Sequence, residues 1–161
     1  MPRLSDNIQL LGDKNLARVI GELKDGMQRR IMTPAIRAAL MPVKQAAKSN
    51  APHRELRRLI KTRTGRSRSG GIFGKVFVGA HPSRTIKWGG PNARGKNGEV
   101  NFAVVGAFYE FGTPNMSPTF WMRGTMRSNR STAMSIMKIK ARERLNAEIK
   151  RARRSGTDIY R

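Results

Sequence analysis

The stretch FYEFGTPNMSPTFW, from Phe108 to Trp121, decides how the chain is expected to fold. It lies between a β-rich region and a long segment of helical periodicity, so it joins a sheet to a C-terminal helix. Gly112 tolerates positive φ and allows a sharp turn, while Thr113 is held extended by the proline after it. We therefore expect an α+β fold with N-terminal helices, a small mainly antiparallel sheet and a long C-terminal helix.

Aromatic side chains in this stretch are expected to clamp the turn against the sheet. Glu110 is the only acid between Glu99 and Glu143 and lies among many cations, so we expect it to pair with an arginine. A simply exposed Glu110 is the alternative. The turn and its aromatic clamp comprise Phe108, Glu110, Phe111, Gly112, Thr113, Phe120 and Trp121.

Two apolar stripes with helical spacing precede the sheet. The first begins at Asp13 and recurs at steps of three and four as far as Ile31. The Thr-Pro pair at 33–34 suits the start of a new helix, which continues to about Asn50. Pro42 inside this second helix predicts a kink.

The densest positive stretch follows these helices. Residues 53–71 contain seven cations and one acid, and their second half has loop composition. We therefore expect a basic loop or insertion that is either mobile or forms the edge of a hairpin. Its cations are candidates for contact with DNA or an acidic partner: Arg54, Arg57, Arg58, Lys61, Arg63, Arg66 and Arg68.

The sheet is expected from three β-rich pieces. Residues 72–80 favour a strand, and residues 85–88 can supply its neighbour. The Asn-Gly pair at 97–98 suits a tight turn before a further strand at 99–105. Residues 106–111 either extend that strand or form one helical turn.

The last helix is expected to run from about Phe120 to Arg154, where Ser155 and Gly156 end it and leave residues 155–161 as a tail. One face of this helix changes from cationic to apolar within a turn. Either the helix breaks near Ser128 or its two halves meet different partners. The cations of this face, Arg123, Arg127 and Arg130, are further candidates for contact with DNA or an acidic partner.

Ile136 and Ile139 point away from the main apolar stripe of this helix, so the helix has a second apolar surface. A lone domain needs one such surface. The second therefore indicates a subunit interface and favours oligomerisation.

Length and charge limit what the chain can be. Its 161 residues suit a single domain spanning 1–161. With 33 Lys and Arg against 10 Asp and Glu, a formal charge of +23 cannot be paired internally, so we expect an anionic partner, either nucleic-acid phosphate or acidic protein. No apolar run is long enough to span a bilayer, so we expect no membrane contact and a cytoplasmic site of synthesis.

Catalytic motifs are weak. The chain has no cysteine, and neither His53 nor His81 belongs to a cluster with ligand or triad spacing. Residues 90–96 have the spacing of a phosphate-binding loop, but Asn97 and a β pattern follow instead of Ser or Thr and a helix. A surface hairpin loop is favoured there. We expect no catalytic, cofactor or metal site, and no enzyme activity.

The segment AFYEFGT at 107–113, followed by MSPTFWMR at 116–123, resembles the tailed-phage neck or tail-completion family of lambdoid type. Members carry an EFGT motif, then a methionine, a proline and a phenylalanine that opens the last helix. The chain departs from the family where His53-Arg-Glu-Leu56 replaces the usual Thr-Gly-x-Leu.

The resemblance implies a virion structural protein that is made in the host cytoplasm and joins head to tail. It implies a ring of six identical subunits that contacts neighbouring neck, connector or tail proteins, with its cations facing DNA phosphates in the channel or acidic protein. The alternative is a non-specific nucleic-acid-binding protein that acts as a monomer or dimer.

Overall fold

A computed structural model of the chain describes residues 13–79, 85–87 and 99–156. The expected α+β class is confirmed. The elements run in the order α1 Asp13–Glu22, α2 Asp25–Asn50, α3 Arg54–Leu59, β1 Ile60–Arg66, β2 Ile72–Val78, β3 Thr85–Lys87, β4 Glu99–Asn101, α4 Phe102–Phe111, α5 Trp121–Ser128 and α6 Arg130–Ser155.

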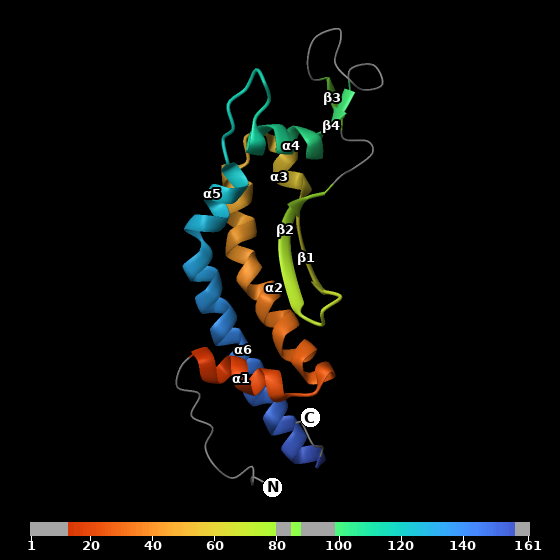
Figure 1. Cartoon of the computed structure of the whole chain (residues 1–161), viewed down its shortest axis with the longest axis vertical. Coiled ribbons are helices and arrows are strands. Elements are labelled where there is room, and N and C mark those ends of the chain that lie inside the picture. The colour runs from red at the N-terminus through yellow and green to blue at the C-terminus, as the bar shows by residue number, and fades with distance from the viewer. Residues whose placement is uncertain (1–12, 80–84, 88–98, 157–161) are drawn as a thin grey trace.

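Helix α2 is the axis of the molecule (Figure 1). Helices α5 and α6 run antiparallel to it along one side, and the β1–β2 hairpin lies along the other. Helix α1 crosses the lower end, whereas α3 and α4 lie at the upper end. The long α2–α6 pair therefore connects the two ends of the molecule.

The first helix break lies at Leu23 and Lys24, not at the predicted Thr-Pro pair at 33–34. The Gln28 side chain donates hydrogen bonds of 3.1 and 3.0 Å to the carbonyls of Gly21 and Leu23, which satisfies the open end of α1. Pro34 lies inside α2, where burial of neighbouring side chains offsets its missing hydrogen bond. Pro42 also lies inside α2, and a kink there stays a prediction.

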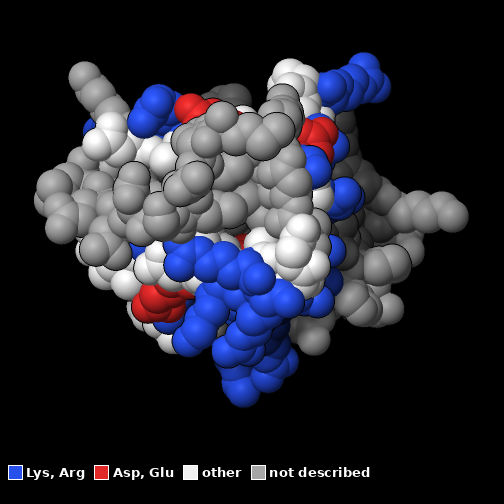
Figure 2. Space-filling model, turned by 90° about the horizontal axis from the view of Figure 1, so that it is seen from below, with Lys and Arg blue, Asp and Glu red and all other residues white. Residues whose placement is uncertain are grey.

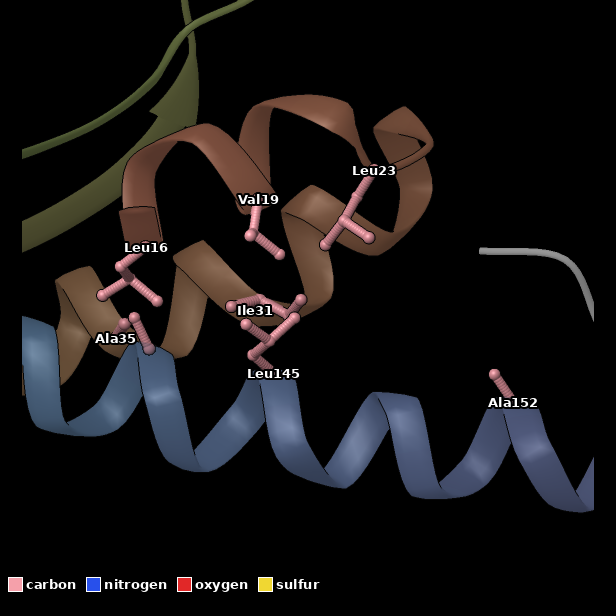
Figure 3. Packing of buried hydrophobic residues seen from close by; sticks show 8 residues of the cluster. Leu16, Val19, Leu23, Ile31, Ala35, Leu145 and Ala152 are labelled. Atoms are coloured by element: carbon pink, nitrogen blue, oxygen red, sulfur yellow. The ribbon is translucent and has the colours of Figure 1, made fainter. Parts of the chain in front are cut away.

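A lower hydrophobic core joins α1, α2 and α6 (Figure 3). Leu16 and Val19 of α1, and Leu23 just after it, point toward Ile31 of α2 and Leu145 of α6. Leu23, Ile31 and Leu145 are fully buried. The predicted apolar stripes of the first and last helices therefore meet each other.

An upper core forms where α2 ends, and it supports the turn after α4. Its buried residues come from α2, α3, β1, α4 and α5 and include Trp121. They are Ala47, Ala51, Leu56, Leu59, Ile60, Phe102, Val105 and Trp121.

Residues 53–71 comprise α3, β1 and the turn after β1. His53 caps α3 by accepting a hydrogen bond of 3.2 Å from the Glu55 amide, and β1 then pairs antiparallel with β2 from Ile60 opposite Val78 to Arg66 opposite Ile72. This is the hairpin alternative. A Cβ at Gly74 would lie 2.8 Å from Leu40, so the hairpin packs closely on α2.

The predicted neighbour of residues 72–78 is wrong. Strand β3 at 85–87 pairs instead with β4, in a separate two-stranded sheet. The strand expected at 99–105 ends at Asn101, whose side chain accepts a hydrogen bond of 2.9 Å from the Ala103 amide and so caps α4. Residues 106–111 are accordingly helical.

The last helix breaks at Asn129, close to the predicted break near Ser128. The Thr125 carbonyl there accepts hydrogen bonds from the side chains of Ser128 and Asn129, at 3.1 and 3.0 Å. Gly156 then ends α6 with a φ of 62°, as expected of a C-terminal glycine. His81, the 90–96 loop, the 97–98 turn and residues 157–161 of the predicted tail lie outside the described residues.

Candidate functional site

The turn between α4 and α5 is held by its own backbone. Gly112 has a φ of 80°, as predicted, and its amide donates a 2.8 Å hydrogen bond to the Phe108 carbonyl. Thr113 and Met116 exchange hydrogen bonds of 2.8 and 3.1 Å. The amide and hydroxyl of Thr119 both donate to the Tyr109 carbonyl, at 2.8 and 2.7 Å. The turn is therefore held in place by hydrogen bonds at the upper end of the molecule.

Glu110 caps α5, the helix that follows this turn. Its carboxylate accepts hydrogen bonds from the amides of Met122 and Arg123, at 2.7 and 3.1 Å, and so satisfies two open donors of α5. The expected arginine partner is Arg123, whose Nε lies 3.6 Å from Oε1. Only 6% of Glu110 is exposed, so the alternative of an exposed carboxylate is wrong.

The predicted aromatic clamp is present only in part. Trp121 is buried and donates a 3.3 Å hydrogen bond to the Gly106 carbonyl, and Phe108 is half-buried. Phe111 and Phe120 are instead 61% and 46% exposed. Their rings face the Arg123 guanidinium, 4.9 and 5.6 Å from its central carbon.

We call Phe111, Phe120 and Arg123 the prong. Phe120 has a φ of 49° and a ψ of 33°, and it is the only non-glycine residue with positive φ in the described part of the chain. This conformation costs about 1–2 kcal/mol and persists only where the surrounding structure fixes it. The Glu110 cap supplies that restraint, because it holds the two amides that come shortly after Phe120.

An apolar notch adjoins the prong, and Arg123 belongs to both. Its volume is about 210 Å³, below the roughly 300–1,000 Å³ of pockets that hold small molecules or cofactors. The notch therefore suits a single side chain of another protein rather than a ligand. It is lined by Val43, Ala47, Val76, Met122, Arg123 and Met126.

Acidic and imidazole groups do not gather at a reactive site in the described part of the molecule. No group of three or more Asp, Glu or His there is placed to hold a metal ion. The His53 ring caps α3 and lies 5.0 Å from the Phe102 ring, so its contacts are structural. Of the helices that the structure describes, none is long and apolar enough to cross a membrane.

The cations nominated from the sequence lie on three different elements. Those of residues 53–71 are exposed along α3, β1 and the turn after β1. Two of them engage acids, since Arg66 lies 2.6 Å from Asp25 and Arg58 lies 2.9 Å from Glu55. Arg123, Arg127 and Arg130 are exposed on α5 and at the start of α6. Of all these cations, Arg123 alone belongs to the prong.

A further group of cations was missed by sequence reasoning. Lys150, Arg151, Arg153 and Arg154 form the last turns of α6 and are exposed. Figure 2 shows a dense group of Lys and Arg side chains at the end of the molecule where α6 finishes. Four cations in five residues were the available signal. We call these four residues the cationic tip.

Comparison of the chain with protein families, characterised proteins and solved structures finds no match.

Proposed function

We propose that this chain is a structural protein of a tailed-phage virion, that it joins head to tail as a ring of identical subunits, and that it acts by binding rather than catalysis. The observation that carries the proposal is a set of large exposed apolar side chains outside the core. Of the eight large hydrophobic residues exposed in the described part, five lie between Phe111 and Ile139. They are Phe111, Phe120, Met126, Met134 and Ile139.

These side chains face away from the surfaces that the monomer buries. Ile139 is 53% exposed and lies roughly 160° around α6 from the buried Ala141. Apolar surface that a monomer leaves exposed marks sites of protein interaction where it forms a patch. Ile136, the other residue predicted for the interface, is half-buried and contributes less.

A ring requires a heterologous contact, in which two different surfaces of neighbouring subunits meet and the rotation closes. The chain offers two such surfaces, the prong with its notch on α5 and the apolar strip on α6, by which we mean Ile136 and Ile139. The resemblance of residues 107–123 to the neck and tail-completion family supports this arrangement and implies six copies. Neighbouring neck, connector or tail proteins would then bind the faces of the ring.

The proposal is tested by the native mass of the protein and of two variants. Ile139→Lys places a charge in the apolar strip and should shift the assembly toward monomers. Ala17→Lys adds the same charge at an exposed position of α1, outside the apolar strip, and should leave the mass unchanged. A wild-type protein that stays monomeric and never enters particles would refute the proposal.

A non-specific nucleic-acid-binding protein that acts as a monomer or dimer is the second candidate. The net charge of +23 favours it, since phosphate binding needs no fixed motif. A monomeric elution profile together with salt-dependent affinity for duplex DNA would select this function over the ring.

A further inference from the structure

We infer that the cationic tip of α6 is the surface through which the protein holds the phosphate backbone of duplex DNA. This inference rests on the proposed function, because a head-to-tail joint surrounds the path of the DNA. It adds to that function the partner of one surface of the protein. The two cationic regions predicted from the sequence, at residues 54–68 and 123–130, then contribute less to DNA binding than the tip does.

Most of the charge of the tip is not compensated by the described part of the protein. Among the described residues, no ion pair involves Lys150, Arg151 or Arg154. The acid nearest to them on α6 is Glu148, whose Oε2 lies 3.7 Å from Arg30 of α2. The helix dipole places only roughly half a negative charge at this end, so most of the positive charge remains.

The cations between Lys150 and Arg154 point away from the core of the protein. Ala152, the one uncharged residue between Lys150 and Arg154, is 7% exposed and belongs to the lower core. The four cations therefore occupy the remaining directions around the helix axis, all exposed. Helix α6 continues past α1 at this end, so the tip projects from the body of the molecule (Figure 1).

The surroundings of the tip favour phosphate over an acidic protein surface. In the described part, no large apolar side chain is exposed on α6 after Ile139, or on α1 and α2 before Met41. Protein interfaces depend on buried apolar or aromatic anchors, which the tip lacks. Three of its four cations are arginines, whose planar donors match phosphate oxygens in pairs. A projecting helix end also fits the major groove of DNA, which is about 12 Å wide.

Three of the ten competing cations have partners on the protein, and the other seven are spread over residues 54–68 and 127–130. Arg123 is engaged by Glu110 and two aromatic rings, and Arg66 and Arg58 have carboxylate partners. The tip instead gathers four cations into five residues, and in the described part no ion pair involves three of them, Lys150, Arg151 and Arg154.

The test measures the affinity of the full chain for a mixed-sequence 30-base-pair duplex by fluorescence anisotropy. The measurement is repeated at salt concentrations of about 50–300 mM, a range in which phosphate contacts respond strongly. The variant Arg151→Gln/Arg153→Gln/Arg154→Gln removes three charges. For each tip bound to DNA, the slope of log affinity against log salt should fall by about 2.7, and the affinity at 150 mM should fall about 100-fold. The matched control is Arg54→Gln/Arg57→Gln/Arg63→Gln, which removes three exposed charges from α3 and β1. Its affinity for the duplex at 150 mM salt should fall by less than about 10-fold.

Three outcomes overturn the inference. One is an equal or larger loss in the control variant, and another is unchanged DNA affinity in the tip variant. The third is a tip variant that loses affinity for poly-glutamate but not for DNA, since the tip would then serve an acidic protein. Far-UV circular dichroism and native mass of both variants show whether fold and assembly persist. Unchanged DNA affinity of the tip variant within an intact ring rejects only this inference, whereas a wild-type monomer excluded from particles rejects the proposed function.

Discussion

Replacing Glu110 by glutamine should destabilise the protein far more than a single surface charge would. The carboxylate accepts two backbone hydrogen bonds and lies beside Arg123 while almost fully buried. Glutamine keeps one acceptor oxygen but turns an NH₂ group toward the other amide, so one charged hydrogen bond and the ion pair are lost. A hydrogen bond to a charged group contributes about 1.5–3 kcal/mol, and loss of a helix cap costs about 0.5–2 kcal/mol.

These ranges overlap because they describe the same interaction, so we expect Glu110→Gln to lower the free energy of unfolding by about 2–3 kcal/mol. For a chain of this size each kcal/mol lowers Tm by about 2–4 °C, which gives a fall of about 4–12 °C. Urea unfolding and thermal melting, both followed by far-UV circular dichroism at fixed protein concentration, measure the two quantities.

Glu143→Gln is the matched control, because it removes the same charge from the same strongly basic chain. Glu143 forms an exposed pair with Lys140 on α6, at 2.8 Å. Such pairs contribute about 0–0.5 kcal/mol. If the two variants were equally stable, Glu110 would act only through its charge, and its assignment as the cap of α5 would be refuted.

Three further substitutions test the packing around the site. Gly112→Ala should cost about 1–3 kcal/mol in chemical denaturation, because φ is 80° and a Cβ would lie 2.8 Å from the Met116 carbonyl oxygen. Gly74→Val should cost at least about 1–3 kcal/mol, since a side chain there meets Leu40 on α2; a smaller loss would show that the hairpin can move away. Leu145→Ala, in the lower core, should cost about 2–5 kcal/mol in the same assay, and full wild-type stability would contradict the burial of Leu145.

Periodicity predicted the helices well where one face is apolar and buried. The stripe through Leu16 and Leu23 and the stripe through Leu145 meet in the lower core, as their spacing indicates. Local chemistry also predicted Gly112 and the Glu110 ion pair. Each of these predictions depended on residues close together in sequence or on one helix face.

The failures occurred where a distant contact overrides a local signal. Pro34 reads as a helix start, yet α2 continues through it because packing on both sides holds the helix. Val104 and Val105 favour a strand, but Asn101 caps a helix there and Val105 packs in the upper core.

The hairpin strand β1 carried a signal that its basic composition obscured. Lys61 and Arg63 are exposed and alternate with the half-buried Thr62 and Thr64, which is the period of a strand with one covered face. Charge content suggested a loop, but alternation was the better guide. The strand that β1 pairs with could not be read from local sequence, because pairing depends on which face α2 covers.

The two proposed surfaces lie on one rigid helix, and this predicts that assembly and DNA binding are coupled. About 18 Å separate Ile139 from Arg151 along α6 at 1.5 Å per residue, so the two sites do not touch. A ring nevertheless presents several tips to one duplex, and simultaneous contacts raise the effective concentration of each tip. Ile139→Lys should therefore weaken DNA binding and reduce its salt slope although it touches no phosphate. By linkage, DNA should in turn stabilise the ring, because it binds the assembled form more tightly. Equal DNA affinity and slope in Ile139→Lys and wild type, with the variant shown to be monomeric, would separate the two activities and refute the coupling.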